Sequence, residues 1–114
     1  MKGSRDTGPS RHDTRSTEQI AHAAADFIVR ESAGQSLITV THARLAAHGD
    51  RASVFVSIFP IEQATTALQF LNNRAGEFRD YLHRQTRLHP LPRIEFMLDD
   101  GSSAWPLDVL KKKP

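Results

Sequence analysis

Residues 36–60 read SLITVTHARLAAHGDRASVFVSIFP and contain two stretches in which side chains alternate between apolar and polar. Residues 36–45 are rich in β-branched side chains, and residues 52–59 place valine and isoleucine at every second position. Between them, the tripeptide HGD at residues 48–50 is typical of a turn. We therefore expect two antiparallel strands joined as a hairpin, with Pro60 ending the second.

After the hairpin, apolar residues recur in steps of four and three, which is the spacing of one face of a helix. The positions are Ala64, Leu68, Leu71, Ala75, Phe78 and Leu82. Within this stripe, Asn72, Asn73 and Gly76 are poor helix formers and together cost ~2 kcal/mol relative to alanines in an unbroken helix. The pattern predicts a kink or a joint between two helices.

Another helix is expected before the hairpin. Ser16 and Gln19 match a capping box, so this helix should begin at Ser16 and end near Gly34. Its apolar face would consist of Ile20, Ala24, Phe27 and Ile28. Near the other end, Pro90 and Pro92 favour an extended entry to a third strand at residues 93–98.

The predicted order is helix, strand, strand, helix, kink, helix, strand. It indicates an α+β fold in which helices cover one face of a three-stranded sheet. With 114 residues the chain should form one domain at residues 16–100, between a flexible N-terminal arm at 1–15 and a short C-terminal tail at 101–114.

Composition excludes several classes of function. The sequence has no cysteine, which rules out disulfides and thiolate sites, and no apolar run is long enough to cross a bilayer. We therefore expect a cytoplasmic protein without membrane contact. The six histidines show no metal-ligand spacing, and no nucleophile elbow or phosphate-binding glycine loop is present. We predict no metal, no cofactor and no enzymatic activity.

The net charge of +2 says little about partners, but arginines concentrate between residues 74 and 93. Arg79, His83 and Arg87 recur every fourth residue, with Arg84 beside them, and so predict a basic helical stripe. Arginine suits phosphate because its planar fork grips two oxygens. The alternative is a surface that is merely solvated, and this alternative applies equally to the arginines that flank the hairpin turn, Arg44 and Arg51.

Four segments resemble the ribosome-binding factor A family, in the same order as in that family. They are ITVTHAR at 38–44, RASVFVS at 51–57, LNNRAGEFR at 71–79 and LPRIEFMLD at 91–99. The element order is also similar to that of a type II KH domain. The family carries an Ala-x-Gly kink between its helices, whereas residues 74–76 here read Arg-Ala-Gly, which keeps the glycine but not the first alanine.

The resemblance implies a non-catalytic factor that binds free small (30S) ribosomal subunits and 16S rRNA and assists late maturation; we expect a monomer. It places RNA contacts at the kink. Together with the basic stripe and the hairpin arginines, the candidate RNA-binding residues are Arg74, Ala75, Gly76, Arg79, His83, Arg84, Arg87, Arg44 and Arg51.

Two other functions compete with this hypothesis. An α+β domain that dimerises or holds a small ligand through its uncovered sheet face would expose a large apolar patch that includes Phe55 and Phe59. A small enzyme would need a concave pocket in which His42 or His83 meets a carboxylate.

Overall fold

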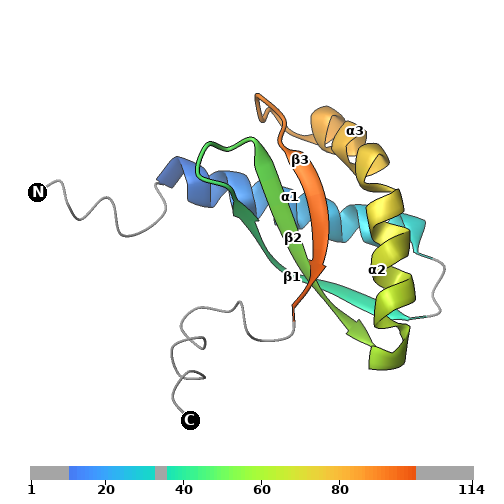
Figure 1. Ribbon diagram of the computed structural model, residues 1–114. Helices are drawn as coiled ribbons and strands as arrows, with labels where there is room; N and C mark the ends of the chain where they lie inside the picture. Colours follow the sequence, from blue (N-terminus) through green and yellow to red (C-terminus); the bar gives the residue numbers. More distant parts are fainter. Residues whose placement is uncertain (1–10, 33–35, 100–114) are drawn as a thin grey trace, which may run out of the picture.

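The structure is a computed structural model that describes residues 11–32 and 36–99 (Figure 1). It confirms the predicted element order. The elements are α1 (Arg11–Glu31), β1 (Leu37–Leu45), β2 (Arg51–Phe59), the short 3-10 helix η2 (Ile61–Gln63), α2 (Ala64–Asn73), α3 (Ala75–Gln85) and β3 (Arg93–Leu98).

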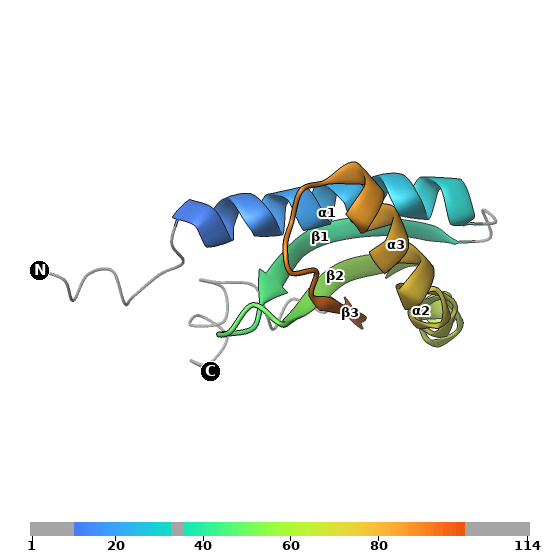
Figure 2. The ribbon, with the colours of Figure 1, turned by 90° about the horizontal axis from the view of Figure 1, so that it is seen from above.

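The three strands form a mixed sheet in the order β1-β2-β3. Strands β1 and β2 pair antiparallel, whereas β3 runs parallel to β2. A parallel neighbour needs a crossover connection, and α2 and α3 provide it. Figure 2 shows α1 and α3 on one side of the sheet, with α2 at its end, so no helix of the described residues covers the opposite face. The predicted α+β architecture is confirmed.

The core lies between the helices and the covered face of the sheet, as the two periodicities predict. Its largest fully buried side chains are Phe78, Phe96, Ile20, Leu71, Leu82, Val54 and Val56. At its centre the Phe78 ring lies 5.3 Å from the Phe27 ring and 5.7 Å from the Phe96 ring. Phe78 therefore joins α1, α3 and β3 through aromatic contacts.

The first helix begins earlier than the sequence indicated. It starts at Arg11, and Ser16 lies inside it with 4% of its surface exposed, so the capping box predicted at Ser16 is wrong. Residues 11–15 contain no glycine or proline that would interrupt a helix, although composition placed them in the arm. The remaining arm residues, the tail at 101–114 and Gly34 lie outside the described residues.

The predicted joint between two helices is confirmed. Helix α2 ends at Asn73, and Arg74 leaves helical geometry with φ −106° and ψ 13° before α3 begins. The amide of Asn72 donates from Nδ2 to the carbonyl oxygen of Phe96 at 3.0 Å, and its Oδ1 accepts from the Phe96 N–H at 2.8 Å. A residue with poor helix propensity thus fastens the joint to β3.

Candidate nucleic-acid interface

The joint leaves the backbone at Gly76 accessible. Gly76 is exposed, and a Cβ built there would meet no atom of the described residues within 4 Å. The residue that precedes α3, Arg74, makes no side-chain cap hydrogen bond. The first N–H groups of a helix have no partner within it and attract anions. Packing therefore does not require glycine here, and an anionic backbone has room to approach.

Arg74 is held by the protein itself. Its Nη1 lies 3.2 Å from Glu77 Oε1 and 3.5 Å from Glu31 Oε1, and its guanidinium lies 4.6 Å from the centre of the Phe70 ring. These contacts link α1, α2 and α3 across the joint. Because two carboxylates balance its charge, the geometry gives Arg74 a structural role, and its contact with RNA stays a prediction.

The predicted basic stripe on α3 is divided between two sides of the helix. Arg79 turns toward the segment before β3, where its Nε donates to the Pro92 carbonyl at 3.0 Å and its Nη2 to the Leu91 carbonyl at 3.1 Å. Arg84 turns toward α1, with its guanidinium 6.0 Å from the centre of the Tyr81 ring. The two arginines therefore do not act as one row.

Arg87 does not belong to the helix at all, and the prediction that it continues the four-residue repeat is wrong. Helix α3 ends at Gln85, and Thr86 is extended with φ −136° and ψ 174°. Thr86 Oγ1 donates to the Leu82 carbonyl at 2.8 Å, which closes the helix end. Arg87 consequently lies on the loop before β3, while His83 stays exposed on α3.

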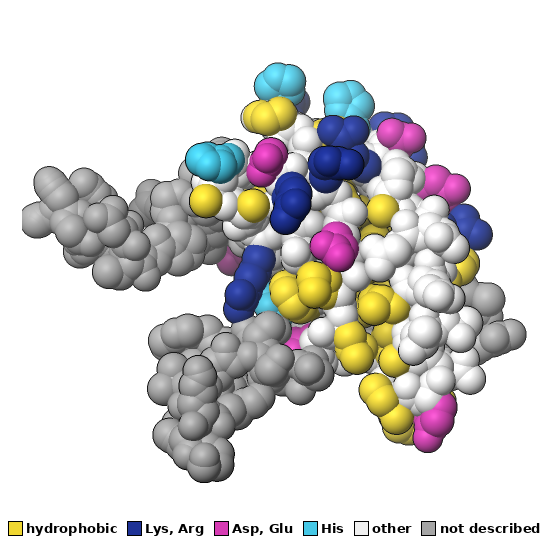
Figure 3. All heavy atoms as spheres, viewed as in Figure 1, with side chains coloured by type: hydrophobic (Ala, Val, Ile, Leu, Met, Phe, Trp, Pro, Cys, Tyr) yellow, Lys and Arg dark blue, Asp and Glu magenta, His cyan; other side chains and the backbone are white. Residues whose placement is uncertain are grey.

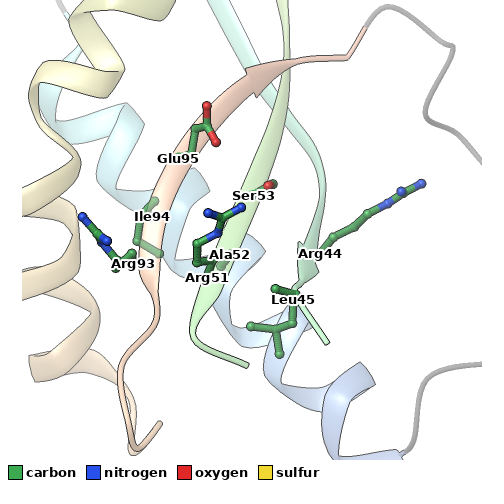
Figure 4. Close-up of a pocket in the computed structure, with 9 residues that line it drawn as sticks. Arg44, Leu45, Arg51, Ala52, Ser53, Arg93, Ile94 and Glu95 are labelled. Carbon is green, nitrogen blue, oxygen red and sulfur yellow. The ribbon is translucent and has the colours of Figure 1, made fainter. Parts of the chain in front are cut away.

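Three arginines, one from each strand, line a shallow hollow of about 400 Å³ on the uncovered face of the sheet. Figure 4 shows Arg51 between Arg44 and Arg93, with Glu95 beside them. Arg51 pairs in register with Arg93 across β2 and β3. Within the described residues, Arg51 and Arg93 form no ion pair, whereas the Arg44 guanidinium lies 5.7 Å from the Phe55 ring.

Arg93 was not among the predicted site residues, although a signal for it was present. Side chains alternate along β3, so Arg93 points to the uncovered face of the sheet while Ile94 and Phe96 point to the core. Arg51 and Ala52 are related in the same way in β2. The sequence alone did not reveal that β2 pairs with β3, and only that register brings Arg51 and Arg93 together.

A second hollow of about 560 Å³ lies where α1, the β1–β2 turn and the loop before β3 meet. Its ionisable lining residues are Arg15, His48, Arg87 and His89, and no acidic residue of the described chain lines it. Figure 3 shows arginine side chains, in dark blue, gathered over the half of the molecule that carries this turn and loop, with hydrophobic side chains farther along the sheet.

The uncovered sheet face is not one large apolar patch. The His42 ring stacks on the Phe55 ring at 4.4 Å, and only 8% of Phe55 is exposed, against 72% of Phe59. Phe59 pairs with Leu37 across β1 and β2, and Leu37 is 66% exposed, so two exposed apolar side chains are neighbours at the end of this face away from the hairpin turn. The exposed apolar group on this face therefore includes Phe59 but not Phe55, which the interaction-domain alternative had placed in the patch.

His42 does meet a carboxylate, but on the sheet face. Its Nδ1 lies 3.7 Å from Asp99 Oδ2, which accepts a hydrogen bond from Thr41 Oγ1 at 2.6 Å. Neither His42 nor Asp99 lines the two hollows described above. The pair therefore lies outside both hollows.

Within the described residues, no three His, Asp or Glu side chains gather as metal ligands would. None of the described helices is both long and apolar enough to span a bilayer.

Comparison with known proteins identifies the family. The family model described as "Ribosome-binding factor A" matches residues 12–104. A relative of that name from Phenylobacterium zucineum is 32% identical over 100 residues, covering 82% of this chain and 68% of its own. Another, from Bdellovibrio bacteriovorus, is 30% identical over 98 residues, covering 83% and 73%.

Solved structures agree. The crystal structure of ribosome-binding factor A from Thermus thermophilus matches with a TM-score of 0.67 and 30% identity, covering 75% of this chain and 94% of the other. A homology model of the Thermus thermophilus factor, fitted into a cryo-EM map of a 30S–RbfA complex, matches with a TM-score of 0.64 and 32% identity, covering 76% and 94%. The chain therefore belongs to the ribosome-binding factor A family.

Proposed function

We propose that this protein binds the free small ribosomal subunit through its 16S rRNA and assists late maturation of the subunit without catalysing a reaction. It acts in the cytoplasm, as a monomer and without a cofactor. Membership of the family supports this function, as does the likeness to a factor that was fitted into a map of its complex with the 30S subunit.

The observation that carries the proposal is the exposed Gly76 in the first turn of α3, where a Cβ would meet no described atom within 4 Å. A phosphate has room to approach the backbone of this turn at Gly76, which carries no side chain of its own. Arg79 and His83 lie farther along α3, and within the described residues the Arg79 guanidinium bonds two carbonyl oxygens and forms no ion pair with a carboxylate. Arg84, Arg87, Arg44 and Arg51 belong to the wider footprint that we propose.

The direct test is sedimentation of the purified protein with 30S subunits, 70S ribosomes or neither. We expect the protein to sediment with free 30S subunits and to dissociate steeply as salt rises, because phosphate contacts release counterions. Failure to sediment with 30S subunits at low salt would contradict the proposed function.

The substitution Gly76→Ala tests whether Gly76 is needed for packing within the protein or for the close approach of RNA. Because the added methyl group meets open space within the protein, we expect the free energy of unfolding to rise by about 0.5 kcal/mol from improved helix propensity. Binding to 30S subunits should fall about ten-fold, since the methyl group blocks a close phosphate. Urea denaturation and sedimentation measure the two effects.

Thr66→Ala is the matched control, because Thr66 is exposed on α2 and its replacement raises helix propensity by a similar amount. It should stabilise the fold and leave subunit binding unchanged. If Gly76→Ala binds 30S subunits as tightly as this control, RNA does not approach the joint at residue 76.

A further inference from the structure

The two basic hollows lie on opposite faces of one hairpin tip. The first is on the uncovered sheet face, and the second is on the face that carries α1 and the loop before β3. Leu45 and Ala46 line both hollows, so the end of β1 forms the wall between them. The tip of the hairpin, residues 46–50, is therefore flanked by positive charge on both sides.

The charge balance at this end favours an anionic partner. Arg44, Arg51 and Arg93 line the first hollow, and Arg15 and Arg87 line the second, with the two histidines in addition. Against them stand Glu95 in the first hollow and Asp50 at the tip. Within the described residues, Arg51 and Arg93 on one side of the tip and Arg15 and Arg87 on the other form no ion pair, so these four suit two lines of phosphates.

The tip itself is narrow. Ala46, Ala47 and Gly49 carry little or no side chain, and Gly49 adopts a φ of +73° that makes the turn tight. The minor groove of an RNA double helix is wide and shallow and presents 2′-hydroxyl groups, with a phosphate strand along each side. Basic hollows on both sides of the tip match the two phosphate strands that border this groove.

We propose that the hairpin tip enters the minor groove of an RNA double helix, with the phosphates of one strand in each hollow. This surface is separate from the joint at Gly76. The inference deepens the proposed function by naming duplex RNA as the ligand of a second surface, and it rests on that function for the source of the RNA.

The test compares two double variants with one control in binding a fluorescent RNA duplex of about 16 base pairs, measured by anisotropy across a salt series. Arg51→Gln with Arg93→Gln removes two charges from the first hollow, and Arg15→Gln with Arg87→Gln removes two from the second. Arg30→Glu is the control, because it changes the net charge equally and Arg30 lies over Tyr81, away from the tip.

We expect each double variant to bind the RNA duplex at least ten-fold more weakly than wild type. The slope of log K against log salt should fall by about 2, because roughly 0.9 counterion is released per phosphate contact. The control should bind within two-fold of wild type, with an unchanged slope. The wild type should prefer the RNA duplex to a DNA duplex or a single RNA strand of the same sequence. Circular dichroism confirms that every variant is folded.

Three outcomes would overturn the inference: no binding of wild type to the RNA duplex, equal preference for the single strand, or double variants that behave like the control. Sedimentation with 30S subunits distinguishes this failure from failure of the proposed function. A wild type that sediments with subunits but ignores the duplex leaves the proposed function standing. If the wild type binds the duplex through both hollows but never sediments with subunits, the inference about the hairpin tip stands and the proposed function fails.

Discussion

Phe78→Ala is expected to lower the free energy of unfolding by about 4 kcal/mol, because it leaves a cavity at the point where three elements meet. Phe78 is fully buried, and its ring contacts Phe27 on α1 and Phe96 on β3. A domain of this size is stable by only about 5–15 kcal/mol, so the variant should be close to unfolding at 37 °C. Urea denaturation followed by circular dichroism measures the loss.

Phe59→Ala is the matched control for Phe78. The same side chain is removed, but Phe59 is 72% exposed at the end of β2, so the loss should be under about 1 kcal/mol. A loss of similar size in both variants would mean that the core is not centred on Phe78.

Asn72→Ala should produce the second large effect, on stability and binding together. The change removes both hydrogen bonds between the Asn72 amide and the backbone of Phe96, and we expect a loss of about 1–2 kcal/mol after the gain in helix propensity. Because this side chain fastens the joint to β3, binding to 30S subunits should weaken beyond what the partial unfolding explains. Denaturation and sedimentation at matched folded fractions separate the two effects.

The neighbouring Asn73→Ala is the control for this change. Asn73 is exposed at the end of α2, so removing its amide leaves the contact with β3 intact. It should leave stability equal or slightly higher and binding unchanged. If both asparagine variants behave alike, the contact with Phe96 does not hold the joint in place.

Most of the fold could be predicted from the periodicity of apolar residues. Alternation in β1 and β2 and the three-four spacing of α2 and α3 are direct consequences of which face is buried, so these elements were predictable from sequence. The joint was predictable because Asn72 and Gly76 oppose an unbroken helix. The family followed from four short segments, and the comparisons confirm it.

The sites were less predictable, because a helical repeat does not reveal where the helix ends or what its flanks contact. Arg87 lies outside the helix because Thr86 is extended. Arg74 forms an ion pair with Glu31, a residue 43 positions earlier in the chain. Arg93 joined Arg51 only through strand pairing. Such contacts depend on tertiary structure, which local spacing does not encode.

The bond between Asn72 and β3 also bears on how copies of this chain meet one another. An outer strand with free N–H and C=O groups is a template on which a strand of another molecule can add. Here the amide of Asn72 occupies both backbone groups of Phe96 on the outer side of β3. Without that amide these two groups would be open to a strand of another molecule, so the side chain that sets the joint also blocks edge pairing at this point of β3.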